Sequence, residues 1–505
     1  MRNYETEAAW HYHNGTKHPN GILLNRSHVY HPTFRPTPYK IYKNNPQVNL
    51  SLDKNSIGVT ALDAISNLIP NIPTIPDLSR LTRVLYFSSG ITKKIKFPDP
   101  LGVVDFRAAS CTGALYHIEI YIVCSEIQGL DAGVYHFDPK EMKLNLIRSG
   151  DFRNIVLSAT ANDQAIIQAP INLIFTDVFS RNSIKYQSRE YRHAFWDCGT
   201  ILGNTLAITT AHQIPSKVIV GFVDSQVSQL LGLDMIKEAP LVILPLGRTE
   251  TDMPTSPPLS EINLEAVSSD YESDYPEINT IHNSSCLLDE QEVSLWKRPI
   301  TLEKISHGES IPLGENIKVQ QSLEETIIKR GSTRKFSYDS ITFEQLSTIL
   351  DQTTSGINAD FVNQKTLLSD IYIIANSVEG LDPGSYYYVR EKNSLEPLRK
   401  GNFRHVSGNL GLDQDLPHDA SVTIFFMTDL KKILEHFGNR GYRVAQLDAA
   451  ITGGKMYLAA YALGLGATGL TFYDDSVTSF FSPHAANKEA MFLIAIGKKE
   501  NLHST

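Results

Sequence analysis

Paired apolar runs along the chain predict strands, with one member of each pair early and one late. The runs at 116–124 and 370–375 are rich in Tyr and Ile, which is typical of β-strands. The runs at 171–179 and 421–430 are short and strongly apolar, as in strands buried at the centre of a sheet. The chain therefore contains two similar sets of predicted strands.

Two longer segments, 190–212 and 441–464, carry apolar residues at helical spacing and are rich in Ala, Leu and small residues. Gly203 in the first segment corresponds to Gly454 in the second. Because a missing side chain removes the steric barrier between helices, we expect these helices to approach a neighbour closely. The order of strands and helices predicts an α+β fold, with helices packed around central sheets.

The pairing of elements follows from an internal duplication. GLDAGVY at 129–135 reappears as GLDPGSY at 380–386, an offset of 251 residues (380 − 129). The same offset aligns a further set of identical residues: Arg148 with Arg399, Gly150 with Gly401, Phe152 with Phe403, Arg153 with Arg404, Arg189 with Arg440, Tyr191 with Tyr442, Arg192 with Arg443, Ala194 with Ala445 and Asp197 with Asp448. A constant offset over such a distance indicates two homologous halves, at about 75–248 and 320–499.

We therefore divide the chain into an N-terminal arm (1–74), a first domain (75–248), a linker (249–319) and a second domain (320–505). The linker begins with a stretch rich in Ser, Pro and acidic residues, which favours a surface connection. Two homologous halves on one chain often dock as a pseudo-symmetric dimer, and we expect that arrangement here.

Composition excludes several classes of function. A chain of 505 residues is too long for one ordinary hydrophobic core, which suggests at least two domains. With 42% hydrophobic and 20% charged residues, its composition is that of a normal globular protein. The net charge of −9 argues against a nucleic-acid partner. No apolar run approaches the roughly 20 residues of a membrane helix, and no secretory signal is visible. The four cysteines form no CxxC motif, so we expect a reduced, cytoplasmic protein.

The N-terminal arm is rich in histidine, which raises the question of a metal site. The histidines are His11, His13, His18, His28 and His31. Their spacing lacks the compact two-plus-two pattern of metal sites, and no cysteine joins them. We expect no bound metal, and we interpret the arm as an irregular segment that covers part of the protein.

Comparison of the two halves separates residues of the fold from candidates for chemistry. Asp197 and Asp448, like Arg192 and Arg443, occur in both halves within predicted helices. We favour buried ion pairing or helix packing for these residues over a catalytic role. Features that occur in only one half are better candidates for chemistry.

The second half opens with SLEETIIKRGSTRKF at 322–336, where Ser322 begins a capping box that predicts a helix ending near Arg330. Arg330, Ser332 and Arg334 cluster at the exit of this helix. Two guanidinium groups and a hydroxyl suit a phosphate, because guanidinium forms paired charge-assisted hydrogen bonds. The alternative is an ordinary solvated basic surface. The first half has no equivalent arginines.

The first half has a distinctive loop, RAASCTGALY at 107–116, before its first predicted strand. It contains the small or hydrogen-bonding residues Ala109, Ser110, Cys111, Thr112 and Gly113. Such a loop can lie flat against a planar ring and offer its backbone N–H groups to that ring. An ordinary turn before a strand is the alternative.

The first half also has an adjacent Lys185 and Tyr186, whereas the second half has His436 and Phe437 at the offset positions. A lysine beside a tyrosine, close to an arginine-rich helix start, could have a perturbed pKa and move protons. A surface lysine beside a packing tyrosine is the alternative.

Together these segments resemble the nitroreductase superfamily, in which FMN lies at the interface of two subunits. RGSTRKF is similar to the phosphate-binding element of that family, and LGLGATGLTFYDD to the loop that faces the reactive edge of the flavin. RAASCTGALY is similar to a flavin-contacting element of the azoline oxidase-like SagB/ThcOx branch. It departs from that element at Ala109, where the branch has proline, and at Cys111 and Thr112, where Gly or Ala is usual.

The resemblance implies a role for each matching residue. It assigns Arg330, Ser332 and Arg334 to the FMN phosphate and ribityl chain. It assigns the flavin ring to Ala109, Ser110, Thr112 and Gly113 from the opposite half, with Gly469, Leu470 and Thr471 at the reactive edge. The pair Lys185 and Tyr186 matches the Lys-Tyr pair that the branch uses to move protons in azoline oxidation.

The resemblance also implies a nitroreductase-like fold duplicated in tandem as an intramolecular pseudo-dimer. Only one of the two possible flavin sites combines all these features, so we expect one FMN per chain. The implied substrate is a thiazoline or oxazoline in a modified peptide, with a cyclodehydratase as a possible biosynthetic partner. An NAD(P)H-dependent nitro- or quinone reductase with the same flavin is the alternative enzyme. A flavin-free binding or scaffold protein is the alternative of another class.

Overall fold

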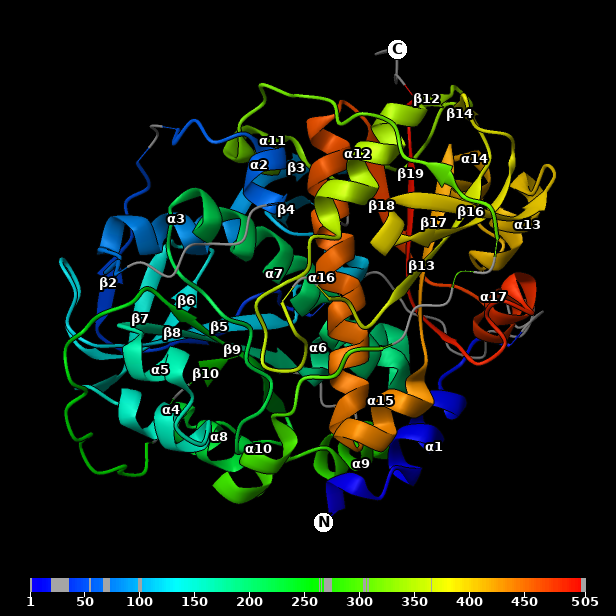
Figure 1. The fold of residues 1–505 in the computed structure, drawn as a ribbon. Coiled ribbons are helices and arrows are strands. Elements are labelled where there is room, and N and C mark those ends of the chain that lie inside the picture. Colours follow the sequence, from blue (N-terminus) through cyan, green and yellow to red (C-terminus); the bar gives the residue numbers. More distant parts are fainter. Residues whose placement is uncertain are drawn as a thin grey trace.

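The computed structural model describes residues 2–19, 36–53, 56–66, 73–98, 102–262, 264, 266–267, 275–302, 306, 308–364 and 366–500. Two large sheets lie on either side of a central pair of long helices (Figure 1). Every strand pair within the two sheets is antiparallel. Among the described residues, no helix has both the length and the apolar character of a membrane span.

The first sheet has six strands and belongs to the first half of the chain, apart from one edge strand from the N-terminal arm. In sheet order its strands are β2 (Gln47–Asn49), β7 (Lys143–Ser149), β6 (Gly133–Asp138), β5 (Ile118–Cys124), β8 (Ile171–Val178) and β9 (Glu238–Leu246). The central strands β5 and β8 are buried along their whole length, as their apolar runs predict.

The second sheet has seven strands. In sheet order they are β11 (Ile311–Pro312), β16 (Ser394–Lys400), β15 (Gly384–Val389), β13 (Asp370–Ala375), β17 (Val422–Thr428), β19 (Glu489–Gly497) and β18 (Gly466–Leu470). The order β7-β6-β5-β8-β9 of the first sheet recurs as β16-β15-β13-β17-β19. Strands β6 and β15 begin 251 residues apart (384 − 133), so the repeat seen in the sequence is also a repeat of strand order.

Most helices of the two halves correspond in the same way, from the one that begins at Arg153 in the first half and at Arg404 in the second onward. Those of the first half are α3 (Leu78–Ser89), α4 (Arg153–Ala159), α5 (Gln164–Gln168), α6 (Phe179–Tyr186), α7 (Glu190–Ala211) and α8 (Asp224–Leu231). Those of the second half are α11 (Leu323–Lys329), α12 (Phe343–Thr353), α13 (Arg404–Leu410), α14 (Asp415–Asp419), α15 (Leu430–Phe437), α16 (Arg440–Ala462) and α17 (Asp474–Phe481). The remaining described helices are α1 (Glu7–Gly15), α2 (Ala61–Ser66), α9 (Pro276–Ser284) and α10 (Glu290–Trp296).

Short strands and 3-10 turns complete the described elements. The strands are β1 (Ile41–Tyr42), β3 (Ile91–Lys96), β4 (Val103–Arg107), β10 (Ala266–Val267), β12 (Ile341–Thr342) and β14 (Val378–Glu379). The 3-10 turns are η1 (Arg2–Tyr4), η4 (Thr112–Ala114), η5 (Gln187–Arg189) and η6 (Arg390–Lys392).

Helices α7 and α16 pack against each other at the centre of the molecule (Figure 1). A Cβ atom added to Gly199 would lie 2.5 Å from the Cβ of Ala450, and one added to Gly203 would lie 3.0 Å from the backbone of Gly454. Contacts this short leave no space for a side chain, so the small residues permit the close approach that the sequence predicts.

The two halves also exchange equivalent ion pairs. Arg192 Nη1 of α7 lies 2.6 Å from Asp474 Oδ1 at the start of α17. Arg443 Nη1 of α16 lies 2.8 Å from Asp224 Oδ1 at the start of α8. All four side chains are buried. Each half thus gives the other a buried arginine and a buried aspartate, as expected for contacts related by a two-fold axis.

We predict that Asp474→Asn lowers the free energy of unfolding by about 3–5 kcal/mol, because it leaves the buried guanidinium of Arg192 without its counter-charge. The neighbouring Asp475, with 76% of its side chain exposed, provides the matched control. Asp475→Asn should cost about 1 kcal/mol or less. Urea unfolding followed by circular dichroism measures both values, and equal losses would contradict the prediction.

The same ion pairs make stability depend on pH. Burial alone would raise the pKa of Asp474, but Arg189 and Arg192 more than offset this and hold the pKa well below its ordinary value. The stability that Asp474 contributes is therefore complete above the unfolded pKa of about 4 and is lost as the pH falls toward the folded value. Urea unfolding at several acidic pH values should show a smaller acid-induced loss in Asp474→Asn than in the wild-type protein.

Segments outside the two halves pack into the same core. In the arm, Tyr12 of α1 is buried and donates a 2.5 Å hydrogen bond to the Ser188 carbonyl. In the linker, Trp296 of α10 is buried and donates to the Phe437 carbonyl at 3.0 Å. The division of the chain into arm, domain, linker and domain remains a proposal. The arm histidines His28 and His31 lie outside the described residues.

Candidate active site

The predicted phosphate-binding arginine of the second half reaches into the first half. Ser322 caps α11 by accepting a hydrogen bond from the Glu325 amide, as the sequence predicts, and Arg330 follows the last residue of the helix. Arg330 Nε donates to the Ala108 carbonyl at 2.8 Å, and Nη2 donates to the Arg107 carbonyl at 3.1 Å. The predicted phosphate clamp and the small-residue loop are therefore in direct contact.

One donor of this guanidinium has no partner. Arg330 Nη1 is buried and has no hydrogen-bond acceptor among the described residues. A buried cationic donor without an acceptor is costly, so Nη1 is a candidate donor to an anionic oxygen. Of the other predicted clamp residues, Ser332 is half-buried and Arg334 is exposed.

One tyrosine contacts both the predicted phosphate clamp, at Ser332, and the predicted reactive-edge loop, at Gly469. The hydroxyl of Tyr457, on α16, lies 3.4 Å from Ser332 Oγ and accepts a hydrogen bond from the Gly469 amide. Leu470 and Thr471 are half-buried, and Thr471 Oγ1 has no hydrogen-bond partner among the residues that the structure describes. Nothing in the sequence singled out Tyr457, because it lies within a helix whose other residues serve packing.

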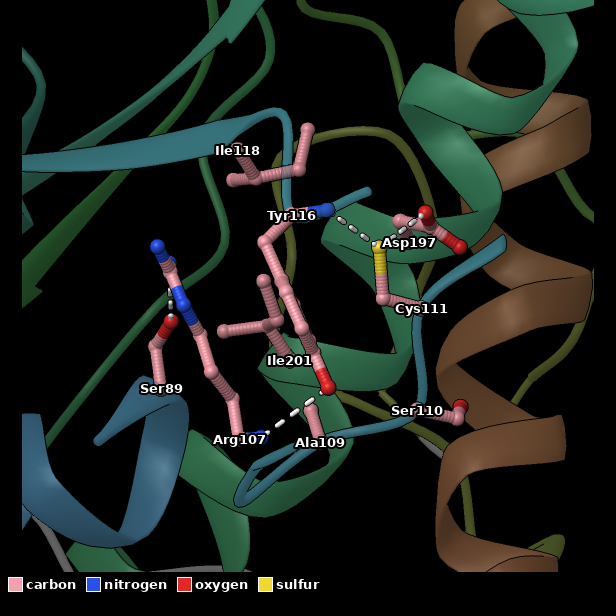
Figure 2. A pocket seen from close by; sticks show the side chains of 9 residues that line it. All are labelled: Ser89, Arg107, Ala109, Ser110, Cys111, Tyr116, Ile118, Asp197 and Ile201. Carbon is pink, nitrogen blue, oxygen red and sulfur yellow. Dashed lines mark hydrogen bonds between the residues drawn. The ribbon is translucent and has the colours of Figure 1, made fainter. Parts of the chain in front are cut away.

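The small-residue loop follows β4 and forms the turn η4, where Gly113 takes a positive φ of 62°. Ala108 and Ala109 are buried, and the Ser110 carbonyl accepts a 2.9 Å hydrogen bond from Thr200 Oγ1 of α7. Behind the loop lies a small cavity of about 10 Å³ (Figure 2). It has room for about one water molecule, so a flavin ring would contact the outer edge of the loop rather than enter the cavity.

The carboxylate of Asp197, on α7, binds the small-residue loop at Cys111 and Thr112. It accepts hydrogen bonds from the Thr112 amide at 2.8 Å, from Thr112 Oγ1 at 2.8 Å and from the Cys111 thiol at 3.0 Å. Figure 2 shows Cys111 and Asp197 facing each other at the cavity. Burial and then the nearby Asp197 raise the pKa of Cys111 to about 11, so the thiol keeps its proton and acts as a donor.

The residues that occur in both halves include Asp197 and Asp448, for which we favoured ion pairing or packing. Arg192 and Arg443 form buried ion pairs. Asp197 lies 2.7 Å from His117 Nε2 in a buried pair and also binds the small-residue loop, which the sequence did not predict. Asp448 accepts hydrogen bonds from the amide and hydroxyl of Ser369.

The predicted proton-transfer pair lies at the end of α6, beside the same loop. Lys185 Nζ lies 5.0 Å from the centroid of the Tyr186 ring. A Cβ atom added to Gly113 would lie 2.9 Å from the Tyr186 hydroxyl, so this hydroxyl touches the turn. The Tyr186 ring meets the His193 ring edge-on, with centroids 4.5 Å apart. The structure thus brings Arg330, the loop and the Lys-Tyr pair to one place.

Among the residues that the structure describes, three groups of side chains have the composition of metal sites. They are Cys111, His117 and Asp197; His117, Asp177 and Glu190; and Asp224, His282 and Cys286. In the third group, both Asp224 oxygens already accept hydrogen bonds from Arg440 and Arg443. That pairing satisfies the aspartate and leaves its role structural.

Comparisons with known proteins point to one family. The profile of the Nitroreductase family matches residues 101–248 and 327–498, one stretch in each half. A crystal structure from Anabaena variabilis, described as that of a nitroreductase, covers 97% of this chain and 99% of its own, with a TM-score of 0.76 and 25% identity. The protein MJ1384 of Methanocaldococcus jannaschii, also assigned by name to the nitroreductases, is 26% identical over 171 residues, 34% of this chain and 80% of that protein. The microcin B17-processing protein McbC of Escherichia coli is 25% identical over 224 residues, 43% of this chain and 76% of that protein.

Proposed function

This chain belongs to the nitroreductase family, and from that premise we propose that it is an FMN-dependent oxidase or dehydrogenase with one flavin site between its two halves. The observation that carries the proposal is the reach of Arg330 across the interface to the Arg107 and Ala108 carbonyls. A phosphate-binding residue from one half and a ring-binding loop from the other are what a shared flavin site requires.

The residues present suit FMN. Arg330 Nη1 offers a buried, unpaired cationic donor, and Arg334 adds an exposed guanidinium. We assign Arg330, Ser332 and Arg334 to the phosphate and ribityl chain, because guanidinium and hydroxyl groups are the usual phosphate donors. We assign Ala109, Ser110, Thr112 and Gly113 to one side of the ring, and Gly469, Leu470 and Thr471 to its reactive edge.

We interpret the whole chain as an intramolecular pseudo-dimer. The reciprocal ion pairs of Arg192 with Asp474 and Arg443 with Asp224, together with the close packing of α7 on α16, support this interpretation. The second possible flavin site would need the arginines in the first half and the loop in the second, and the sequence has neither. We therefore predict one FMN per chain.

The proposed reaction is the two-electron dehydrogenation of a peptide-derived azoline to an azole, in which a hydride leaves one ring carbon, a proton leaves the neighbouring ring carbon, and the single bond between these carbons becomes a double bond. Bound FMN supplies the hydride acceptor in such reactions. In this chain Lys185 or Tyr186 removes or relays the accompanying proton, and the Cys111–Gly113 turn holds the Tyr186 hydroxyl in place. Similarity to McbC, which is named for processing microcin B17, favours a peptide-derived substrate. A cyclodehydratase partner is the further proposal that the resemblance to the azoline oxidase-like branch implies.

The visible spectrum of the purified protein tests the flavin proposal. We expect flavin absorption with a ratio of one FMN per chain, measured after release of the flavin by denaturation. A ratio of two would contradict the single site, and a colourless protein that cannot be reconstituted with FMN would favour a binding or scaffold role.

Anaerobic mixing with NADH or NADPH separates the two candidate enzymes. The relatives assigned by name to the nitroreductases favour the alternative of an NAD(P)H-dependent nitro- or quinone reductase. Rapid bleaching of the flavin by NAD(P)H would support that reductase. A flavin that stays oxidised with NAD(P)H but is reduced by a thiazoline peptide would support the oxidase or dehydrogenase.

A further inference from the structure

A cluster of buried ionisable side chains lies behind the Cys111–Gly113 turn. His117 Nδ1 lies 2.6 Å from Asp177 Oδ1 and 3.5 Å from Glu190 Oε1, and its Nε2 lies 2.7 Å from Asp197 Oδ2. All four side chains are buried. We call His117, Asp177, Glu190 and Asp197 the buried acid cluster.

The cluster places two carboxylates side by side with few donors around them. Both Glu190 oxygens and Asp177 Oδ2 lack hydrogen-bond donors among the described residues. Two neighbouring carboxylates in an apolar interior do not both ionise, so one retains a proton. Burial, and then Asp177, raise the pKa of Glu190 well above its ordinary value, which identifies Glu190 as the protonated acid.

The histidine of the cluster is charged. Burial alone would lower the pKa of His117, but Asp177 and Asp197 more than offset this and raise the pKa well above its ordinary value. The imidazolium lies between the carboxylates of Asp177 and Asp197, and Asp197 also accepts the loop donors. Within the described part of the chain, His117 is thus the cation that both aspartates contact.

A proton fits between His117 and Asp177 better than a metal ion does. Metal–ligand bonds of about 2.0–2.2 Å would hold the two ligand atoms roughly 3 Å or more apart. The observed 2.6 Å between Nδ1 and Oδ1 is a hydrogen-bond distance.

The second half shows that the fold does not need these charges. At the positions 251 residues further along, it has Leu368, Thr428 and Gly441 in place of the histidine, the aspartate and the glutamate of the cluster. It keeps only Asp448, the counterpart of Asp197. The equivalent strands β13 and β17 and helix α16 form without the charges, so the cluster serves something that only the first half has.

We propose that His117 is a positioning residue for the flavin site, an inference that rests on the proposed function. By contacting Asp197 Oδ2 at 2.7 Å it orients that carboxylate, which accepts from the Thr112 amide, the Thr112 hydroxyl and the Cys111 thiol together. The turn, held in this way, places Gly113 against the Tyr186 hydroxyl. The cluster therefore holds both the ring-binding loop and Tyr186 in place, because both depend on the turn that Asp197 binds.

The test replaces the cluster with the residues of the second half. The variant carries His117→Leu, Asp177→Thr and Glu190→Gly, and Asp197→Asn is a second, smaller change that removes one charge. Asp448→Asn is the matched control in the other half. Amide hydrogen exchange of the flavin-free protein reports on the turn itself, and titration with FMN reports on the site.

We expect at least tenfold faster exchange of the amides at 108–116 and at least tenfold weaker FMN binding in both first-half variants, with no change in Asp448→Asn. Unchanged exchange in a folded triple variant or in Asp197→Asn would overturn the positioning role. A wild-type protein that binds no FMN would overturn the proposed function instead, and the exchange measurements would still decide whether the cluster orders the turn.

Discussion

Replacing Arg330 with alanine is expected to weaken FMN binding about a hundredfold, close to 3 kcal/mol. Two losses combine in this variant. A charge-assisted hydrogen bond to phosphate contributes about 1.5–3 kcal/mol, and Nη1 is the buried donor left to form it. The bonds from Nε and Nη2 to the Ala108 and Arg107 carbonyls also disappear, which loosens the loop on the other side of the site.

Titration of flavin-free protein with FMN, followed by flavin fluorescence, measures this effect. Lys329→Ala is the matched control, because Lys329 is the adjacent residue and 62% of its side chain is exposed. It should bind FMN like the wild-type protein. Arg330→Lys keeps the charge but not the planar fork, so its affinity should fall between the two. If Arg330→Ala binds FMN with wild-type affinity while remaining folded, the assignment of the phosphate site is wrong.

The fold was largely predictable because the same pattern of apolar runs occurs twice along the chain. The apolar runs that predict β5, β8, β13 and β17 are local signals, and the constant offset shows that the same sheet must recur. The order of strands within each sheet depends on contacts distant in sequence, and no local pattern encodes it. Helix α10 was missed for a related reason: it lies in a polar linker, and its Trp296 becomes a core residue only through its contact with Phe437.

Comparison of the halves selected candidate site residues where the halves differ and passed over Asp197, where they agree. Arg330 and the Lys-Tyr pair have no counterpart in the other half, so comparison of the halves singled them out. Asp197 has the counterpart Asp448 and was therefore attributed to the fold, although only Asp197 binds the loop. His117 has Leu368 at the offset position, so the comparison that found Arg330 contained a signal for this residue as well.

Lys185→Ala is expected to leave FMN binding intact and to lower turnover about 10²–10⁴-fold, the range typical of a lost general acid or base. Binding should survive because Lys185 lies against the Tyr186 ring at the end of α6, whereas the Arg330 clamp comes from the other half. Oxidation of a synthetic thiazoline peptide, followed by mass spectrometry as the loss of two hydrogen atoms, measures turnover.

Two further variants locate the proton-transfer group within the pair. Tyr186→Phe keeps the ring that Lys185 contacts but removes the hydroxyl beside Gly113, so a loss equal to that of Lys185→Ala would mean that both groups act on one proton. His436→Ala changes the offset position in the second half and should leave turnover unchanged, because only the first half carries the Lys-Tyr pair. Turnover that survives in Lys185→Ala and falls only in Tyr186→Phe would assign the proton to the tyrosine. Turnover that survives in both would show that this pair does not move the proton, and the acceptor would have to be sought elsewhere around the loop.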